Sequence, residues 1–478
     1  MKKLEKITPQ SEDFARWYTD VVKQGDLMEY GPVKGTIIFK SNSFGIWENI
    51  QTEFNKIIKA KGVKNVYLPL LIPLSYIEKE KEHVKGFAPE LATITKVGEK
   101  ELNQHSVIRP TSEVLFGELF AKEINSYNDL PIMYNQWANV LRWEKTTNPF
   151  LRTSEFLWQE GHTAHSNSQE AISLSKTMIE TYANFCEEFL AIPVIVGEKT
   201  EKEKFAGAVT TYTIEAMMKD GKALQSGTSH YLGQNFAKSF NIKFMNKENK
   251  QEFAYQTSWG ISTRLIGAII MTHGDDRGLI MPPRIASTQI DILELFANKN
   301  DRVKEVSQKL MKTLSQKYRV NIDATDKGPG FKAGQSEIQG TPIRIEIGPR
   351  DLEKDLVTLI RRDTLEKKEV KIEDVEQEIP LLLDSIHKNL LESAKQRLKE
   401  RTVELETYDE FKKAFTNDKD LKFVIVPFDG GEKEEEIIKK ETLATTRCLP
   451  FNYENTEKKK CIITGKLTNR YVIFAKAY

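Results

Sequence analysis

The stretch RWEKTTNPFLRTSEFLWQEGH, residues 142–162, decides the fold predicted for this chain. A polar turn separates Arg142 and Glu144 from a second segment in which residues of different polarity alternate. Alternate residues of a strand lie on the same face, so Arg142 and Glu144 share one face of the first segment. The second segment places two aromatic rings, a carboxylate and an imidazole together: Phe156, Trp158, Glu160 and His162. The pattern predicts a β-hairpin whose two strands share one surface.

This shared surface is too polar to pack into a core without partners. A nucleotide would supply them: a phosphate for Arg142, a purine amino group for Glu144 and a base plane for Phe156. The alternative is an ordinary hairpin with surface ion pairs. The hairpin therefore predicts a ligand site that the rest of the sequence must identify.

The 478 residues exceed what one hydrophobic core holds, so several domains are expected. Strand-like segments separated by tight turns favour a largely antiparallel sheet in residues 1–284, up to the break at Pro282-Pro283. Residues 285–378 predict a small mixed α/β module, with a strand over 289–296 and helices over 302–318 and 352–359. Residues 379–478 form a third region, which opens with a long helix over 381–404.

The composition narrows the functional classes. Hydrophobic residues make up 39% and charged residues 29%, and no apolar run approaches the roughly 18 residues of a membrane-spanning helix, so no membrane is expected. The net charge of +1 implies that any RNA binding uses local patches. Residues 1–6 do not resemble a secretory signal, and three scattered cysteines indicate reduced thiols. A cytoplasmic location is expected.

Three segments resemble, in order, the signature motifs of class II aminoacyl-tRNA synthetases. The hairpin is similar to motif 2, with its Arg-x-Glu, variable loop and returning phenylalanine. The helix ending at 61–62 and the strand to Pro69 resemble motif 1, the dimer element of that family. Residues 259–264 and the apolar run behind them resemble motif 3, although only Gly260 remains of its glycine-rich form.

Five further stretches resemble the archaeal and eukaryotic type of prolyl-tRNA synthetase: 109–113, 151–165, 204–208, 225–230 and 273–278. The resemblance covers essentially the whole chain. It implies an α+β fold: an antiparallel class II catalytic domain, a mixed α/β anticodon-binding domain and a small α+β C-terminal domain. It also implies proline–tRNA ligase activity, in which ATP converts proline to prolyl-adenylate and pyrophosphate, and prolyl then passes to the 3′ end of tRNA(Pro).

The resemblance assigns roles to individual residues. Proline-binding positions of the family match Thr111, Glu113, Arg142 and His230, and pocket walls match Trp158, Glu160, His162 and Phe205. ATP-binding positions match Arg142, Glu144, Arg152, Thr153, Phe156, Gln225, Thr228, Ser262 and Arg264. The proline carboxylate itself attacks the α-phosphorus, so Arg142 and Arg264 are the expected catalytic residues, spreading the phosphoryl charge together with Mg²⁺.

The same resemblance places anticodon recognition at Glu346 and Arg350, whose side chains suit guanine edges. A surface ion-pair cluster is an equally weighted alternative. Many relatives carry a four-cysteine zinc site, but only Cys448 and Cys461 remain near the C-terminus, so no bound zinc and no other metal site is expected. Residues 273–276, His-Gly-Asp-Asp, predict a structured turn rather than metal ligands.

Two features of the resemblance concern fidelity and assembly. The segment between motifs 2 and 3 leaves no room for the large editing insertion of bacterial-type relatives, so the chain is expected to lack it. Motif 1 implies a homodimer. The competing interpretations are a synthetase for threonine, serine or glycine, which Thr111, Glu113 and His230 disfavour, and an inactive paralogue that only binds tRNA. The intact ATP-binding positions disfavour the paralogue: Arg142, Glu144, Phe156 and Arg264.

Overall fold

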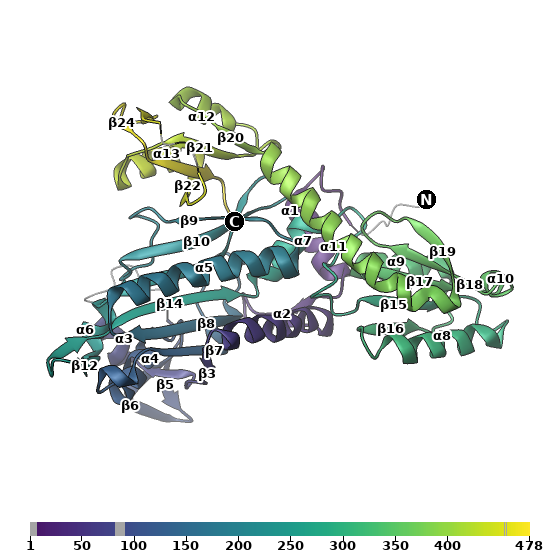
Figure 1. Cartoon of the computed structure of the whole chain (residues 1–478), viewed down its shortest axis with the longest axis horizontal. Helices are drawn as coiled ribbons and strands as arrows, with labels where there is room; N and C mark the ends of the chain where they lie inside the picture. Colours follow the sequence, from purple (N-terminus) through teal and green to yellow (C-terminus); the bar gives the residue numbers. More distant parts are fainter. Residues whose placement is uncertain (1–6, 82–90, 454, 456) are drawn as a thin grey trace.

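The computed structural model describes residues 7–81, 91–453, 455 and 457–478. The N-terminal segment 1–6, on which the absence of a secretory signal was predicted, lies outside these residues. Figure 1 shows a large sheet with helices packed on it, a smaller α/β body beside it, and a C-terminal body reached through the long helix α11 (Val375–Glu400). No described helix is both long and apolar enough to span a membrane.

The central sheet has eleven strands in the order β20-β21-β25-β22-β9-β10-β11-β14-β8-β7-β3. Its middle strands pair antiparallel throughout, which confirms the predicted antiparallel sheet. These strands are β7 (Ile132–Leu141), β8 (Glu155–His165), β9 (Val194–Glu198), β10 (Thr210–Met217), β11 (Ala223–Gly233) and β14 (Tyr255–Ser262).

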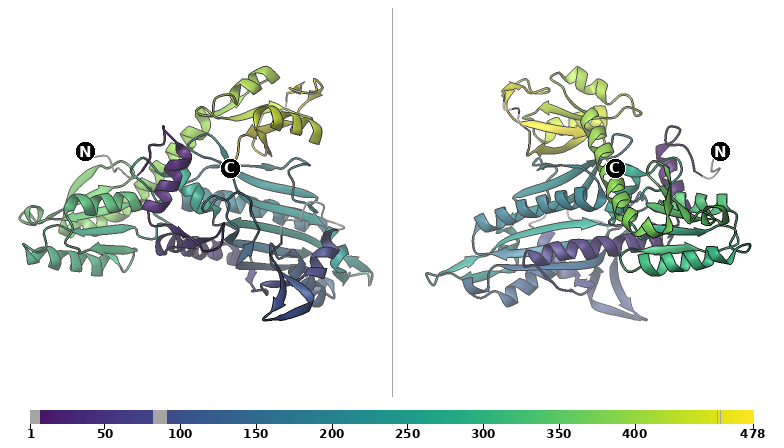
Figure 2. Two further views of the ribbon diagram at one scale, coloured as in Figure 1. Left: turned by 180° about the vertical axis from the view of Figure 1, so that it is seen from behind. Right: turned by 45° about the vertical axis from the view of Figure 1, so that its right-hand side comes forward.

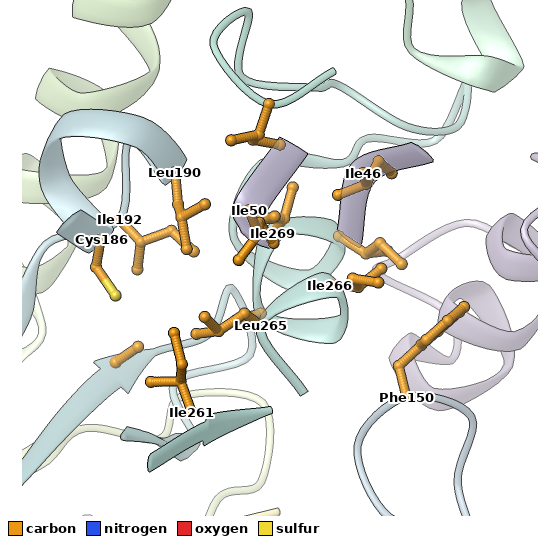
Figure 3. Close-up of a cluster of buried hydrophobic side chains, with 14 of the residues drawn as sticks. Ile46, Ile50, Phe150, Cys186, Leu190, Ile192, Ile261, Leu265, Ile266 and Ile269 are labelled. Carbon is orange, nitrogen blue, oxygen red and sulfur yellow. The ribbon is translucent and has the colours of Figure 1, made fainter. Parts of the chain in front are cut away.

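Three helices bury one face of this sheet: α2 (Ser41–Ala60), α5 (Ser168–Leu190) and α7 (Arg264–His273). All nine residues of α7 after Arg264 are buried, as expected for a helix that is apolar on all sides. In Figure 3, Ile50 of α2, Leu190 of α5 and Leu265 of α7 meet above Ile261 of β14. Because this core occupies one face, the site forms elsewhere on the strands.

Smaller elements surround the sheet. Helix α1 (Phe14–Gln24) is capped by Asp13, whose side chain accepts from the Arg16 N–H at 2.9 Å. The other peripheral elements are β1 (Met28–Tyr30), β2 (Ile37–Phe39), α3 (Leu74–Lys81), β5 (Thr93–Val97), β6 (Lys100–Ile108), α4 (Glu113–Glu123), α6 (Asn235–Phe240), β12 (Lys243–Met245) and β13 (Gln251–Phe253). Motif 1 consists of the end of α2 and the short strand β3 (Lys64–Asn65). The next strand, β4 (Leu71–Pro73), is separate, because Pro69 lacks the amide hydrogen that a continuous strand would donate.

The second body has a five-stranded sheet in the order β16-β15-β17-β18-β19. Its parallel and antiparallel pairs confirm the predicted mixed module. Its elements are β15 (Ile290–Glu294), α8 (Asp301–Leu314), β16 (Val320–Asp323), α9 (Pro329–Gln339), β17 (Ile343–Ile347), α10 (Pro349–Leu352), β18 (Leu356–Arg361) and β19 (Lys367–Lys371).

The helix predicted over 352–359 is wrong. Helix α10 stops at Leu352, Asp355 turns the chain with a φ of 56°, and β18 follows at once. The side chains of Val357 and Leu359 are almost completely buried. Pairing with β17 and β19 on both sides outweighs the local helical pattern.

The C-terminal body continues the central sheet. Strand β22 (Thr445–Pro450) pairs with β9 of the central sheet, Leu449 opposite Glu198. The remaining elements are β20 (Thr402–Glu404), α12 (Tyr408–Ala414), β21 (Phe423–Pro427), α13 (Glu432–Thr442), β23 (Lys459–Lys460), β24 (Leu467–Thr468) and β25 (Tyr471–Ala475). The two further views in Figure 2 show this body beside the edge of the central sheet.

Candidate active site

A cavity of about 350 Å³ lies against the strands β8, β10, β11 and β14. Every residue that the sequence assigned to proline or ATP lines it. Residues from separate parts of the chain, from Thr111 to Arg264, thus meet in one place.

The predicted hairpin is present. The prediction that Arg142 and Glu144 lie in its first strand is wrong. Strand β7 ends at Leu141, opposite Glu155, so Arg142 and Glu144 already belong to the connecting loop. The loop is held by a hydrogen bond from the Arg142 N–H to the Ser154 carbonyl at 2.8 Å. The loop, rather than strand pleating, directs Arg142 and Glu144 into the cavity.

Arg142 is a partly buried cation that lines the cavity. Its Nε donates to the Pro110 carbonyl at 3.0 Å. The guanidinium carbon lies 5.5 Å from the ring centroid of Phe156 and 5.3 Å from that of Trp158. Burial lowers the pKa of Arg142, although nearby carboxylates oppose this, and an arginine stays charged. Such a guanidinium is suited to a carboxylate or a phosphate.

The end of the cavity that the sequence predicts to bind the amino acid contains a fixed carboxylate, Glu160. Glu160 accepts from the Ser112 hydroxyl at 2.6 Å and from the Gln136 amide at 2.9 Å. Its other oxygen is 3.0 Å from His162 Nε2. Burial alone would raise the pKa of Glu160, but these hydrogen bonds hold it below its usual value. Glu160 is therefore ionised, and its carboxylate orients the imidazole of His162. Nearby, the hydroxyl of Thr111 donates a hydrogen bond to the carboxylate of Glu113.

His230 closes the same end from β11. Its Nδ1 is 3.0 Å from the Thr211 hydroxyl, and its ring centroid is 4.6 Å from that of Phe205. Burial lowers the pKa of His230 to about 3, so the imidazole is neutral at physiological pH. The side chains of Phe205 and Trp158 give this end of the cavity its apolar walls.

The opposite end, which the sequence predicts to bind ATP, contains a second arginine, Arg264. Arg264 is the first residue of α7, where the helix dipole favours anions. Its Nε donates to the Leu151 carbonyl at 3.0 Å and its Nη1 to the Gln225 carbonyl at 3.3 Å. Burial lowers the pKa of Arg264 to about 10, so it remains a cation. Glu144 and Arg152 form an ion pair at 3.7 Å on the rim.

Three buried histidines predict acid sensitivity. Burial lowers the pKa of His165 to about 4 and those of His230 and His273 to about 3. In the unfolded chain these histidines have a pKa of about 6.5, so below that pH the unfolded state binds protons that the folded state does not. The free energy of unfolding therefore falls as the pH falls. We expect the melting temperature to fall from pH 6.5 to 4.5. In His273→Gln the amide can still donate to the Leu190 carbonyl, which lies 2.9 Å from Nε2 of His273. This variant should show a smaller fall in melting temperature between pH 6.5 and 4.5. An unchanged fall would contradict the assigned role of His273.

Several lining residues carried no recognisable sequence signal. Lys199, Thr211 and Ser258 line the cavity from β9, β10 and β14 or their ends. Gly161 is required because a Cβ there would lie 2.2 Å from the ring of Trp259. Their placement depends on strand register, which a local motif does not reveal.

The remaining predicted residues lie away from the cavity. Glu346 of β17 accepts from Arg344 Nε at 3.0 Å, and Arg350 lies in α10. The thiols of Cys448 and Cys461 are buried in two different hydrophobic clusters.

The His-Gly-Asp-Asp segment forms the predicted turn. Asp275 accepts two hydrogen bonds from the guanidinium of Arg362, at 2.9 and 2.6 Å. The turn therefore joins the body of the central sheet to the second, α/β body.

Comparison with known proteins follows the same division of the chain. Residues 96–273 match the model for the tRNA synthetase class II core domain (G, H, P, S and T), and residues 289–381 match the anticodon binding domain. Residues 408–478 match the C-terminal domain of prolyl-tRNA synthetase. A proline–tRNA ligase of Mycoplasma mobile is 63% identical over 478 residues, covering 100% of both chains.

The chain belongs to the prolyl-tRNA synthetase family. A further relative, the proline–tRNA ligase of Oceanobacillus iheyensis, is 50% identical and covers 99% of this chain and 98% of its own. The crystal structure of prolyl-tRNA synthetase from Cryptosporidium parvum, complexed with halofuginone and AMPPNP, is 39% identical, with a TM-score of 0.94 and 99% of each chain covered. The predicted family and class II fold are confirmed, and a synthetase for threonine, serine or glycine is set aside.

Proposed function

We propose that this chain is a proline–tRNA ligase that activates proline with ATP and transfers prolyl to tRNA(Pro). One observation carries the proposal: Arg142 lines the same cavity as Glu113, Glu160 and His230, the groups proposed for proline, and as Arg264, the group proposed for the polyphosphate. The 63% identity to a proline–tRNA ligase, which covers 100% of both chains, supports the proposal. AMPPNP, an ATP analogue, is bound in the related structure of 39% identity.

At the amino-acid end, Glu113 accepts from the charged secondary amine of proline and Arg142 holds its carboxylate. Trp158 and Phe205 contact the ring, and neutral His230 closes the pocket without adding a second cation. The remaining proposed contacts are Thr111, Glu160 and His162. A ring-sized apolar pocket with a few directed polar groups selects by shape and hydrogen bonding.

At the nucleotide end, Phe156 stacks on the adenine and Glu144 accepts from its amino group. Arg264 holds the γ-phosphate at the start of α7. The remaining proposed contacts are Arg152, Thr153, Gln225, Thr228 and Ser262. Chemistry then requires only that the proline carboxylate is held in line with the α-phosphorus, which removes much of the entropic barrier, while Arg142 and Arg264 stabilise the developing charge.

Magnesium is proposed to arrive with the nucleotide. The described residues hold no group of three or more histidine, cysteine, aspartate or glutamate side chains arranged for a metal. Mg²⁺ usually keeps several waters and is bound through substrate phosphates with one or two carboxylates, so such a cage is unnecessary. The separation of Cys448 and Cys461 into two clusters supports the proposal that this chain binds no structural zinc.

The division into domains 1–284, 285–378 and 379–478 remains a proposal. Residue 378 lies within α11, so the second proposed boundary falls in a helix rather than in a linker. The loop 145–151 would meet the acceptor end of the tRNA. Glu346 and Arg350 would address guanine edges of the anticodon, with Glu346 released from Arg344 on binding.

A homodimer is proposed through motif 1. Tyr67, Leu70 and Leu71 beside it are exposed apolar side chains of the kind that interfaces cover. A monomeric mass in dilute solution would count against it. Three buried free cysteines support a reducing compartment, which fits the cytoplasm.

The activity is tested by amino-acid-dependent exchange of labelled pyrophosphate into ATP, with all twenty amino acids. We expect strong exchange with proline and far weaker exchange with the others. Exchange with none would favour the inactive tRNA-binding paralogue. A dominant signal from another amino acid would overturn the specificity.

The chain is also proposed to lack an editing domain, as the archaeal and eukaryotic type does. Between β8 and β14, residues 166–254 are used by α5, three central-sheet strands and short surface elements. No separate folded body stands between motifs 2 and 3 among these residues, all of which the structure describes. Incubation with alanyl-tRNA(Pro) should therefore show no hydrolysis above the uncatalysed rate, and rapid deacylation would refute this.

A further inference from the structure

A buried ion triad connects the C-terminal body to the nucleotide end of the cavity. Glu215 of β10 accepts from Lys199 Nζ at 2.9 Å through one oxygen. Its other oxygen accepts from Arg447 Nε at 3.0 Å and Nη2 at 2.9 Å. The exposed fractions of the three side chains are 2% for Lys199, 1% for Glu215 and 8% for Arg447. Arg447 belongs to β22, far from the others in sequence.

The triad is placed to act on the site. Lys199 lines the cavity, and Glu215 is the cross-strand partner of Gln225, whose carbonyl accepts from Arg264. With two cations and one carboxylate, the triad carries one net positive charge beside the expected polyphosphate. In a buried setting such a charge is weakly screened. Removing Arg447 would leave Lys199 and Glu215 neutral as a pair.

A second contact fixes the same wall. Thr200 donates to Glu435 of α13 at 3.2 Å, and Thr446 of β22 donates to the same oxygen at 2.9 Å. The segment that follows leads to Phe205, whose N–H donates to the Thr211 hydroxyl at 2.9 Å. The C-terminal body therefore also contacts the segment that leads to Phe205, through Thr200, Thr446 and Glu435, which a change at Arg447 leaves in place.

We propose that Arg447 is a positioning residue for ATP in proline activation, acting through Glu215 and Lys199. The C-terminal body is then part of the activating site itself. This inference rests on the proposed function. A purely structural clamp is the competing explanation, because removing one partner of any buried ion pair destabilises a protein.

The experiment is proline-dependent pyrophosphate exchange without tRNA, with KM measured separately for ATP and proline. Arg447→Met should raise the KM for ATP about tenfold and leave the KM for proline within about twofold. Arg447→Lys loses one of the two hydrogen bonds to Glu215 but keeps the net charge on which the proposal rests, so it should stay within about threefold of the unchanged protein for ATP. Lys459→Met, which removes an exposed ion pair with Glu404 and Glu406, is the matched control and should change neither constant.

The double variant Glu215→Gln with Arg447→Met decides between charge and structure. It restores one net positive charge through Lys199 and should return the KM for ATP to within about threefold of the unchanged protein. A clamp instead predicts that the second change adds to the damage. If Arg447→Met does not fold, judged by its melting temperature, Arg447→Gln replaces it.

The inference is overturned if Arg447→Met or Arg447→Gln leaves the KM for ATP unchanged. It is also overturned if these variants lose only the charging of tRNA. In both cases the proposed function stands. Additive damage in the double variant overturns it as well. If the unchanged protein shows no proline-dependent exchange, the proposed function fails, and the inference fails with it.

Discussion

Replacing Arg142 with alanine is expected to lower kcat/KM for proline-dependent pyrophosphate exchange by about 1,000-fold or more. Loss of a single charge-stabilising donor typically costs 10²–10³ in rate, and Arg142 is proposed to serve both the proline carboxylate and the phosphate. Its guanidinium is prepared for this by burial against Phe156 and Trp158 and by one bond to Pro110.

The geometry of Arg142 makes a conservative change costly as well. Arg142→Lys keeps the charge but loses the planar fork that binds a carboxylate in two places, so a loss of about 100-fold is expected. Arg302→Ala, in which the lost arginine donates to the Leu352 carbonyl in the α/β body, is the control and should retain full exchange. Normal exchange by Arg142→Ala, with an unchanged melting temperature, would remove Arg142 from the mechanism.

Replacing Arg264 with alanine is expected to lower kcat by about 100- to 1,000-fold and to leave the KM for proline nearly unchanged. Arg264 lies at the first position of α7, held by the carbonyls of Leu151 and Gln225. We therefore propose that Arg264 contacts the end of the polyphosphate that departs, where charge develops in the transition state, and not the amino-acid pocket.

The separation of kcat from the KM for proline is the informative measurement for Arg264. A mutation that removes an interaction made only in the transition state lowers kcat without weakening proline binding. Arg284→Ala removes a surface arginine paired with Glu188 and should behave as the unchanged protein. An equal rise in the KM for proline would place Arg264 in the amino-acid pocket instead and refute its role.

Much of the site followed from short sequence motifs. Alternation in 155–162 predicted the strand β8, and its polar face required a ligand. Every residue carried over to proline or ATP lines the cavity, because motif residues are neighbours on one hairpin, one strand or one helix start. Local periodicity determines which face a side chain takes, so it can be read from sequence.

Other predictions failed where local and non-local preferences compete. Arg142 and Glu144 follow β7 instead of lying in it, since the ladder with β8 ends at Leu141. Residues 352–359 carry a helical pattern, but pairing on both edges makes 356–361 a strand. In both cases, strand pairing with other segments determined where the strand begins or ends.

The sequence alone therefore indicated the family, the hairpin and the residues of each motif that line the cavity, because these depend on residues close together in the chain. Only the tertiary structure joined β22 to β9 and placed Arg447 on Glu215 beneath the nucleotide end of the cavity. The physical reason is that strand pairing and buried charge neutralisation are satisfied by backbone and side-chain groups more than 200 positions apart. No local pattern specifies which distant partner will supply them.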